Sequence, residues 1–555
     1  MTDLVEAVLA SADRTPDAPA LTARGRSWSY RELARRIRAV SAGLRAEGLE
    51  LGDPVLFSVR PGPDAVVLAL GIVDAGGVVV FADPGAGEAL FRARAGLADP
   101  RWVAAESLLY LASSGPLRPL ARRRGLELAP YATLVADARY LRAGPWLPGV
   151  PRRALSLGRL MRGGRRRAGQ RGGDQRGGPT AGTAVGAGVA AEARNGLRSE
   201  LHRALELHRA LVVFTSGTTG APKAVVHTRG SLGAGLADFA DGVGIRPGLR
   251  VLSDQLMVGI PALIGGAHWT MPDQGLDPGA RPEAYLEHLA DAELLFAAPA
   301  ALDTILRALD ARPELTPALE TIVLGGAPVL PPLLRRAFAR FPGVRIRAVY
   351  GMTEILPVAI ADGARKLAAA GKEGDRVGRL VPSVTARIVD DELLLAGPGL
   401  ALGYLAELPE HPLAELRTGD RATIDGDELV LRGRAKDMFI RGTQNVYPGL
   451  YEPIIAGLPG VLDAAMAGVP DAIGDDRIVV AVVPAADPPT SATSAHPLVA
   501  EVARRLPGLI DAGVLPDAVV ALPALPRSGR ARKLDRAALA GIVAPFVAGG
   551  GARGG

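Results

Sequence analysis

Residues 214–223 read Phe-Thr-Ser-Gly-Thr-Thr-Gly-Ala-Pro-Lys and directly follow the apolar run Leu211-Val212-Val213. Gly217 and Gly220 have no Cβ, so the backbone can turn sharply and bring its N–H groups close to phosphate oxygens. Hydroxyls and one ammonium group add further donors, on Thr215, Ser216, Thr218, Thr219 and Lys223. The stretch therefore predicts a polyphosphate-binding loop that follows a buried strand.

The spacing of this loop separates it from the common P-loop. Its glycines and lysine follow the pattern Gly-x-x-Gly-x-x-Lys, whereas a P-loop needs Gly-x-x-x-x-Gly-Lys-Ser/Thr. The alternative interpretation is a solvated Ser/Thr/Gly turn, but a run of this length that ends in Pro-Lys is unusual for one. We therefore favour a phosphate clamp of another class over a kinase-like or GTPase-like site.

The chain as a whole is large, cysteine-free and rich in apolar residues. Its 555 residues are 48% hydrophobic, enough for the cores of roughly three to four domains. The lack of cysteine excludes disulfides, thiolate metal sites and a cysteine nucleophile. The N-terminus is acidic, and the longest apolar stretch, residues 65–82, is interrupted by Asp74 and two glycines. We expect a cytoplasmic protein without an export signal or a transmembrane segment.

One segment carries much of the net charge of +6. Between Arg152 and Arg176 the only acidic residue is Asp174, and residues 163–191 are dominated by Gly, Arg, Ala and Thr without an apolar period. This composition predicts a disordered insertion. Since it lacks the interleaved aromatic residues that stack on bases, we interpret it as a solvated loop without a specific nucleic-acid partner.

Helical and strand patterns alternate along the rest of the chain. Residues 30–44 have helical spacing, with Ser29 as a candidate N-cap. Short apolar runs predict strands at residues 54–57, 78–81, 211–214, 294–296 and 321–324. The pattern predicts an α/β fold with largely parallel, buried strands. We place a large N-terminal domain at 1–433, a small C-terminal domain at 434–545 and a flexible tail at 546–555.

Five weaker motifs follow the loop in order. They are Gly325-Gly326-Ala327-Pro328, Tyr350-Gly351-Met352-Thr353-Glu354, Arg417-Thr418-Gly419-Asp420, Gly433-Arg434-Ala435-Lys436-Asp437, and Pro526-Arg527 with Lys533. Each one alone is compatible with a turn, a surface hairpin or a solvated lysine. The second motif offers an aromatic plane, a hydroxyl and a carboxylate, which suit a purine, a phosphate ester and Mg²⁺. Asp420 suits the vicinal hydroxyls of a ribose.

In this order the motifs resemble those of the adenylate-forming superfamily, which includes acyl-CoA synthetases, nonribosomal adenylation domains and luciferases. The resemblance covers about residues 4–539, apart from the Arg/Gly-rich insertion. It implies mixed sheets flanked by helices in the N-terminal domain, which holds ATP and an acid, and a mobile α+β C-terminal domain that swings over them. The implied activity is that of an AMP-forming carboxylate ligase that requires ATP and Mg²⁺.

The resemblance also implies a role for each matching residue. The loop from Thr215 to Lys223, with Ser216, Gly217, Thr218, Thr219 and Gly220, would hold the β- and γ-phosphates. Gly326, Ala327 and Tyr350 would line the adenine, Thr353 would contact the α-phosphate, and Glu354 would ligate Mg²⁺. Asp420 and Arg434 would hold the ribose, Lys436 would be the hinge, and Lys533 would enter the site for adenylation.

The acceptor of the acyl group stays open between three alternatives. Thioester-forming relatives carry Gly-Gly-Glu-Asn-Val-Tyr-Pro where this chain has Gly442-Thr443-Gln444-Asn445-Val446-Tyr447-Pro448, and Leu450 replaces a glutamate while Glu452 is kept. CoA or an acyl carrier protein is the first alternative. The motifs around Tyr350 also resemble β-lactone synthetases, in which the hydroxyl of the acid is the acceptor. The third alternative is a catalytically silent ATP-binding module.

The acid itself is expected to be fatty or otherwise apolar. Residues 255–263 and 297–299 are the predicted lining of its pocket, and they are small and apolar. They contain no Asp or Lys that could pair with the charged groups of an amino acid.

Overall fold

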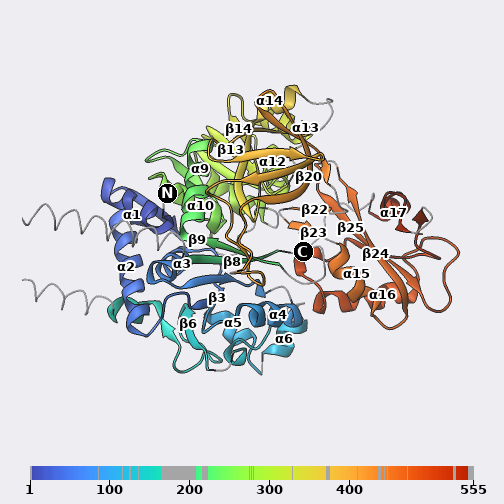
Figure 1. Cartoon of the computed structure of the whole chain (residues 1–555), viewed down its shortest axis with the longest axis horizontal. Coiled ribbons are helices and arrows are strands. Elements are labelled where there is room, and N and C mark those ends of the chain that lie inside the picture. Colours follow the sequence, from blue (N-terminus) through green and yellow to red (C-terminus); the bar gives the residue numbers. More distant parts are fainter. Residues whose placement is uncertain are drawn as a thin grey trace, which may run out of the picture.

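The computed structural model describes residues 3–547 except 85–86, 116, 124–126, 136, 164–207, 216–222, 274–275, 277, 279–280, 328, 330, 370–374, 409, 435–438, 443, 447, 472 and 529–532. It has a large N-terminal part built on two mixed sheets and a small α+β C-terminal part (Figure 1). The predicted fold class is confirmed. The predicted insertion beyond Gly163, Ser216 to Gly220, Lys436 and Thr443 lie outside the described residues.

The first sheet has eight strands in the order β19-β9-β8-β4-β3-β5-β6-β7. Their bounds are β3 (Pro54–Ser58), β4 (Val78–Phe81), β5 (Trp102–Glu106), β6 (Arg139–Ala143), β7 (Leu155–Ser156), β8 (Arg209–Thr215), β9 (Lys223–Thr228) and β19 (Gly403–Tyr404). The strands from β8 to β7 in this order are parallel, whereas β9 is antiparallel to both β8 and β19. The strand β8 leads into the predicted phosphate loop, and β9 leads out of it.

The second sheet has thirteen strands in the order β17-β18-β20-β21-β16-β15-β14-β13-β12-β10-β11-β1-β2. Their bounds are β1 (Pro19–Ala23), β2 (Arg26–Ser29), β10 (Arg250–Leu252), β11 (His268–Thr270), β12 (Leu294–Ala297), β13 (Thr321–Gly325), β14 (Arg345–Met352), β15 (Ile355–Asp362), β16 (Asp375–Leu380), β17 (Thr385–Val389), β18 (Glu392–Ala396), β20 (Leu416–Asp425) and β21 (Glu428–Arg434). From β14 to β17 all neighbours are antiparallel, so the sheet is parallel only in its middle.

Helices cover and separate the two sheets. Those of the N-terminal part are α1 (Leu4–Arg14), α2 (Tyr30–Ala46), α3 (Pro63–Ala75), α4 (Glu88–Ala98), α5 (Ser107–Ala112), α6 (Arg118–Arg123), α9 (Arg229–Val243), α10 (Leu256–Ile264), α11 (Pro282–Leu289), α12 (Pro299–Asp310), α13 (Pro331–Arg340) and α14 (Gly363–Ala368). The largest buried cluster joins side chains of α1, α2, α3, α9 and α10 to both sheets. These helices therefore form the layer between the sheets.

The C-terminal part, on the right of Figure 1, has its own small sheet in the order β24-β25-β26. Its elements are β22 (Phe439–Arg441), β23 (Gln444–Val446), α15 (Pro448–Ala456), β24 (Val461–Pro470), β25 (Asp476–Pro484), α16 (Pro497–Arg505), β26 (Ala518–Ala521), β27 (Arg527–Ser528), β28 (Lys533–Leu534) and α17 (Arg536–Val543). Two buried clusters, one on each side of this sheet, form a core separate from the N-terminal one.

The elements predicted from apolar patterns are present. The helix predicted from residue 30 is α2, and Ser29 caps it by accepting a hydrogen bond from the Glu32 backbone N–H at 3.2 Å. The apolar stretch 65–82 forms the buried helix α3 and the strand β4. Each of the five predicted strands lies within an observed strand of one of the two sheets. In the described part of the chain, no helix combines the length and apolar character needed to span a bilayer.

A buried ion pair joins α1 to α9. Asp3 caps α1 by accepting from the backbone N–H groups of Val5 and Glu6, and it also accepts from Nη2 of Arg229 at 2.8 Å. The two side chains are only 1% and 5% exposed. A buried charge is tolerated when it is paired in this way, so the contact fixes the first turn of α9 directly after β9.

A second polar contact joins the two parts of the molecule. Arg94 on α4 donates to Oδ2 of Asp511 at 3.2 Å, and the hydroxyl of Tyr451 on α15 donates to the same oxygen at 3.0 Å. Burial raises the pKa of the Asp511 carboxyl, and the charge of Arg94 opposes this effect. The Arg94 guanidinium carbon also lies 5.7 Å from the ring centroid of Phe214 in β8. Arg94 thus connects the C-terminal part to the strand that enters the phosphate loop.

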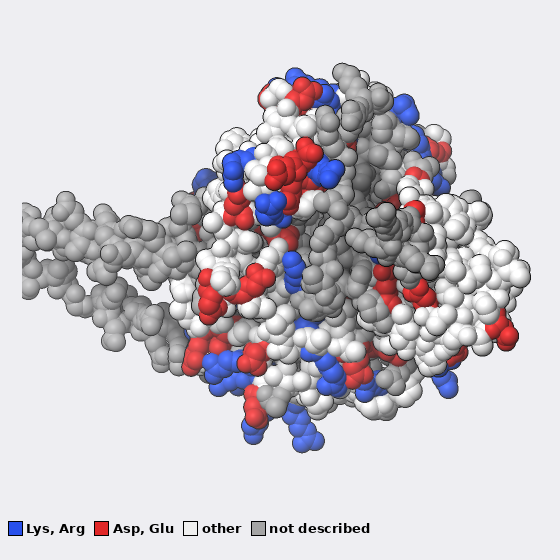
Figure 2. Space-filling view, turned by 45° about the vertical axis from the view of Figure 1, so that its right-hand side comes forward, with Lys and Arg blue, Asp and Glu red and all other residues white. Residues whose placement is uncertain are grey.

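Charges on the surface are mixed. Figure 2 shows acidic and basic side chains interspersed on the described part of one face, mainly over the N-terminal part. Many of them form exposed ion pairs, such as Arg387 with Glu415 and Arg31 with Asp17. Exposed pairs of this kind contribute little to stability, about 0–1 kcal/mol each.

Candidate active site

The turn between β14 and β15 carries two of the predicted site residues. Thr353 and Glu354 lie between the paired residues Met352 and Ile355 of this antiparallel hairpin. Gly235 of α9 packs against the start of β15, since a Cβ there would lie 2.4 Å from the Leu356 carbonyl oxygen. The hairpin is therefore held close to α9.

The predicted adenine residues lie at the same edge of the sheet. Gly326 and Ala327 follow directly after β13, which is parallel to β14 with Gly325 opposite Val349. Gly326 has a φ of +82°, a left-handed conformation that glycine adopts without strain. Because parallel strands end at one edge, the sheet brings these two residues near Tyr350 of β14.

Tyr350 contacts the predicted ribose carboxylate directly. Its hydroxyl donates to Oδ2 of Asp420 at 2.5 Å, and Asp420 is only 1% exposed. The backbone N–H of Asp420 donates to the hydroxyl oxygen of Thr418, which itself donates to the Leu393 carbonyl. Across β20 and β21 Asp420 is paired with Arg434. The buried position excludes the surface-hairpin interpretation of Asp420, and the expectation that a strand follows this residue was wrong, because Asp420 lies inside β20.

The two ends of the phosphate loop face each other. Thr215 and Lys223 are paired across β8 and β9. The Lys223 ammonium nitrogen lies 4.7 Å from the ring centroid of Tyr404, and the Tyr404 hydroxyl donates to Oε1 of Glu354 at 3.1 Å. The predicted phosphate lysine and magnesium carboxylate thus share one aromatic neighbour, Tyr404, which the sequence did not indicate.

His227 in β9 is a second neighbour that sequence reasoning missed. Its Nε2 lies 2.7 Å from the Thr353 carbonyl oxygen, and its Nδ1 lies 3.1 Å from Oγ of Ser231. A carbonyl only accepts, so the proton is on Nε2, and Nδ1 accepts from the serine. Burial lowers the pKa of the His227 ring, and the bond to Thr353 opposes this effect. A neutral His227 therefore fixes the peptide between Thr353 and Glu354.

His227 predicts loss of stability in acid. Because its pKa is lowered in the folded state, the unfolded chain takes up the proton first as the pH falls below about 6.5, the ordinary histidine value. Its contribution is present above that pH, and below it stability should fall by up to about 1.4 kcal/mol per pH unit. Thermal midpoints measured between pH 7.5 and 5.5 check this result.

The matched variants for this measurement are His227→Gln and His411→Gln. His411 is exposed, so its replacement should leave the pH slope of the midpoint as it is in the natural chain. Glutamine at 227 cannot take up a proton and should flatten the slope, although His208 and His268, whose pKa values burial also lowers, contribute with the same sign. Equal slopes in both variants would contradict the assignment to His227.

The predicted catalytic lysine lies on the C-terminal part. Lys533 begins β28 and is paired with Ser528 of β27. Three residues later Arg536 forms a bidentate pair with Glu452 of α15, with N···O distances of 2.7 and 3.0 Å. Glu452 also accepts from the Met466 backbone N–H at 2.8 Å. This pair anchors the start of α17, and with it the end of β28, on the C-terminal sheet.

The predicted acid pocket is largely filled by core side chains. Residues 256–264 form α10, most of whose side chains are buried among the helices between the sheets. Gly259 packs directly on the ring of Trp269, where a Cβ would come within 1.9 Å. Gln255, Met257 and Ile264 are partly exposed. Any opening for the acid along α10 would therefore lie beside these three residues.

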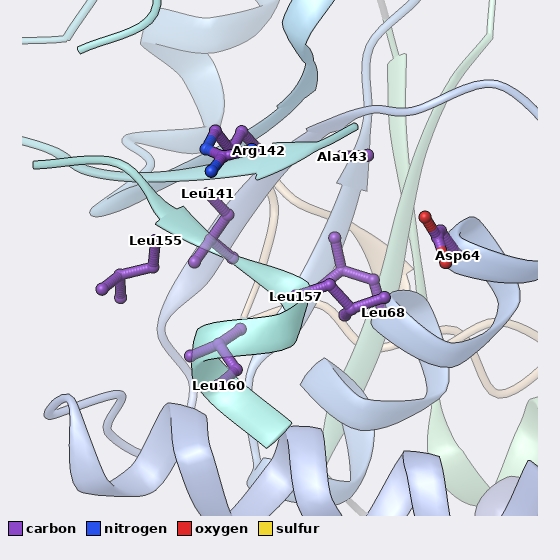
Figure 3. Close-up of a pocket in the computed structure, with 8 residues that line it drawn as sticks. All are labelled: Asp64, Leu68, Leu141, Arg142, Ala143, Leu155, Leu157 and Leu160. Carbon is purple, nitrogen blue, oxygen red and sulfur yellow. The ribbon is translucent and has the colours of Figure 1, made fainter. Parts of the chain in front are cut away.

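A small apolar hollow elsewhere is not this pocket. Figure 3 shows it among leucines of α3, β6 and the segment after β7, with Asp64 at one side. It encloses about 210 Å³, partly open to solvent, and is too narrow for a water molecule. It also lies at the β7 edge of the eight-stranded sheet, opposite the β19 and β9 edge that carries Tyr404 and Lys223.

A magnesium ion would rest on a single protein carboxylate here. The residues described include no cluster of three or more His, Asp or Glu side chains arranged to hold a metal. Mg²⁺ in nucleotide sites is usually bound by one or two carboxylates together with phosphates and water. Glu354, oriented by Tyr404, fits an ion that arrives with a nucleotide.

Comparison with known proteins agrees with this arrangement. Residues 8–405 match the family of AMP-binding enzymes, and residues 451–532 match the AMP-binding enzyme C-terminal domain. The chain is 30% identical over 363 residues to an indoleacetate–CoA ligase of Aromatoleum aromaticum, covering 59% of this chain and 66% of that ligase. It is 31% identical over 301 residues to a feruloyl-CoA synthase of an Amycolatopsis species, covering 50% and 59%. The chain thus spans less than two thirds of either relative.

Solved structures share the fold over nearly the whole chain. The amide bond synthetase McbA of Marinactinospora thermotolerans superposes with a TM-score of 0.73 at 22% identity, covering 97% of this chain and 99% of that one. A malonyl-CoA ligase complex with methylmalonyl-CoA and AMP gives a TM-score of 0.63 at 25% identity, covering 92% and 97%. Since the family match extends over more than half of the sequence, the chain belongs to the AMP-binding enzymes, the adenylate-forming superfamily.

Proposed function

We propose that this protein is an AMP-forming ligase that activates a carboxylic acid with ATP and Mg²⁺ and then transfers the acyl group to the thiol of CoA or of a carrier protein. The observation that carries the proposal is the contact of Tyr404 with both Lys223 and Glu354. It joins a phosphate-loop cation to a carboxylate suited to Mg²⁺, in a chain that belongs to the AMP-binding enzymes. The reaction would take place in the cytoplasm, a location with which the cysteine-free composition is compatible.

The residues would divide the first half-reaction between them. A carboxylate that attacks the α-phosphate brings two anions together, so positive charge must be in place at the transition state. Lys223 and the loop would hold the β- and γ-phosphates, while Tyr350 with Asp420 and Arg434 would orient the nucleoside. When bound, Mg²⁺ on Glu354 neutralises phosphate charge, and Lys533 would bring a second positive charge to the α-phosphate. Lys436 would be the hinge of the C-terminal domain, residues 434–545.

The acid is proposed to be apolar, either fatty or aromatic. The apolar residues of α10 support this choice, and the relatives named above are ligases of indoleacetate and of a feruloyl group. The thiol acceptor is supported by the same relatives, which are named for CoA products. Because Thr443 stands where thioester-forming relatives have glycine, its side chain would narrow the path of the thiol.

A panel of acids tests the proposal. We expect ATP–pyrophosphate exchange with at least one apolar acid, and AMP release that CoA accelerates. Thr443→Gly should raise the dependence of AMP release on CoA severalfold, because it removes a side chain from the thiol path. A β-hydroxy acid that releases AMP fully without CoA would instead favour the β-lactone alternative. Tight ATP binding without exchange for any acid would favour a silent ATP-binding module.

A further inference from the structure

A short segment bridges the two sheets at the candidate site. Residues 401–405, which include β19, lie between the turn that carries Glu354 and the strand β9. The Ala401 N–H donates to the Glu354 carbonyl at 2.7 Å, and on the other side the N–H groups of Leu402 and Leu405 donate to carbonyls of β9, both at 2.8 Å. The backbone of this segment therefore fixes Glu354 relative to Lys223, the first residue of β9.

The side chain of Tyr404 repeats this connection with two different contacts. Its ring lies under the Lys223 ammonium group, and its hydroxyl donates to the Glu354 carboxylate. Both charged groups thus have a neutral partner. A cation held on an aromatic face and a carboxylate held by a hydroxyl keep their charges available for other ligands.

We propose that Tyr404 is a positioning residue that holds Glu354 and Lys223 at the separation required by a metal-bound triphosphate. This inference rests on the proposed function and adds one residue to it. The hydroxyl would select the orientation of Glu354 in which Oε2 faces the metal, and the ring would hold the lysine toward the β- and γ-phosphates. Partners of a metal ligand that act in this way affect metal affinity strongly when they are removed, by about 10–100-fold.

Two replacements separate the two contacts. Tyr404→Phe keeps the ring under Lys223 but removes the hydroxyl, so it should weaken metal binding about tenfold while the affinity for metal-free nucleotide stays unchanged. Tyr404→Leu removes both contacts, so it should also weaken metal-free nucleotide binding, by about threefold. Tyr140→Phe is the matched control, since its hydroxyl donates to the Val135 carbonyl at 3.1 Å on β6, near the other edge of the sheet.

The measurement is an electron paramagnetic resonance titration of Mn²⁺ with the full chain and a nonhydrolysable ATP analogue, alongside calorimetry of the analogue without metal. Melting curves of every variant confirm folding. The proposal is overturned if Tyr404→Phe binds Mn²⁺ as the natural chain does, or if it weakens metal-free and metal-bound nucleotide equally. Absence of exchange with every acid would sink the proposed ligase function, whereas the Mn²⁺ titration still reports on Tyr404.

Discussion

Replacement of Lys533 by alanine is expected to slow pyrophosphate release by about 10²–10³-fold, since removal of one preorganised group that stabilises developing charge has effects of this size. The loss should appear in the rate of the chemical step and much less in the affinity for ATP, because the loop and Lys223 would carry most of the phosphate binding. Fold stability should not change, since β28 is a short strand paired only with β27.

Single-turnover measurement of pyrophosphate release checks this expectation, with Arg504→Ala as the control. Arg504 is also a cation of the C-terminal part, but its side chain is 70% exposed and pairs only with Glu501 of the same helix. That variant should keep full activity. The mechanism loses Lys533 if a well-folded Lys533→Ala protein releases pyrophosphate at the normal rate. The reverse reaction, ATP formation from acyl-adenylate and pyrophosphate, should fall by the same factor because it passes through the same transition state.

Local patterns in the sequence were enough to predict most of the first layer of the site. Apolar runs located β8, β12 and β13, and parallel strands that end at one edge explain why Gly326 and Tyr350 come together. The carboxylates Glu354 and Asp420 stood out because their motifs combine groups of complementary chemistry. The antiparallel half of the large sheet did not stand out, since its strands alternate between partly exposed and buried residues and resemble ordinary loops.

The neighbours of these residues depend on tertiary contacts that no local pattern reveals. Tyr404 reaches Glu354 across 50 positions of sequence, and His227 reaches Thr353 across 126. Both lie in or beside β9, the strand that leaves the phosphate loop. A signal did exist for His227, since the histidine stands four residues before Ser231 at a junction of strand and helix. Tyr404 had only a short Gly-Tyr pair after an apolar run, which is common in loops.

Replacement of Glu354 by glutamine is the second variant with a large expected effect. Glutamine keeps the size of the side chain and an oxygen that can accept from Tyr404, but it removes the negative charge. Mg²⁺ prefers charged oxygen ligands, and a bound metal stabilises the transition state of phosphoryl chemistry by several kcal/mol. We therefore expect turnover to fall by about 100-fold or more at millimolar Mg²⁺, with part of the loss recovered as Mg²⁺ is raised.

Binding of adenosine should separate this effect from general damage to the site. Tyr350 and Asp420 form their own hydrogen-bonded pair and contact the nucleoside side of the predicted site, so adenosine should bind Glu354→Gln almost normally. Glu407→Gln makes the same chemical change at an exposed residue three positions after Tyr404, and it should leave both Mg²⁺ dependence and turnover unchanged. An unaltered Mg²⁺ requirement in Glu354→Gln would assign the metal to another ligand. Because glutamine keeps the bond from Tyr404, that outcome would also separate the position of the side chain from its charge.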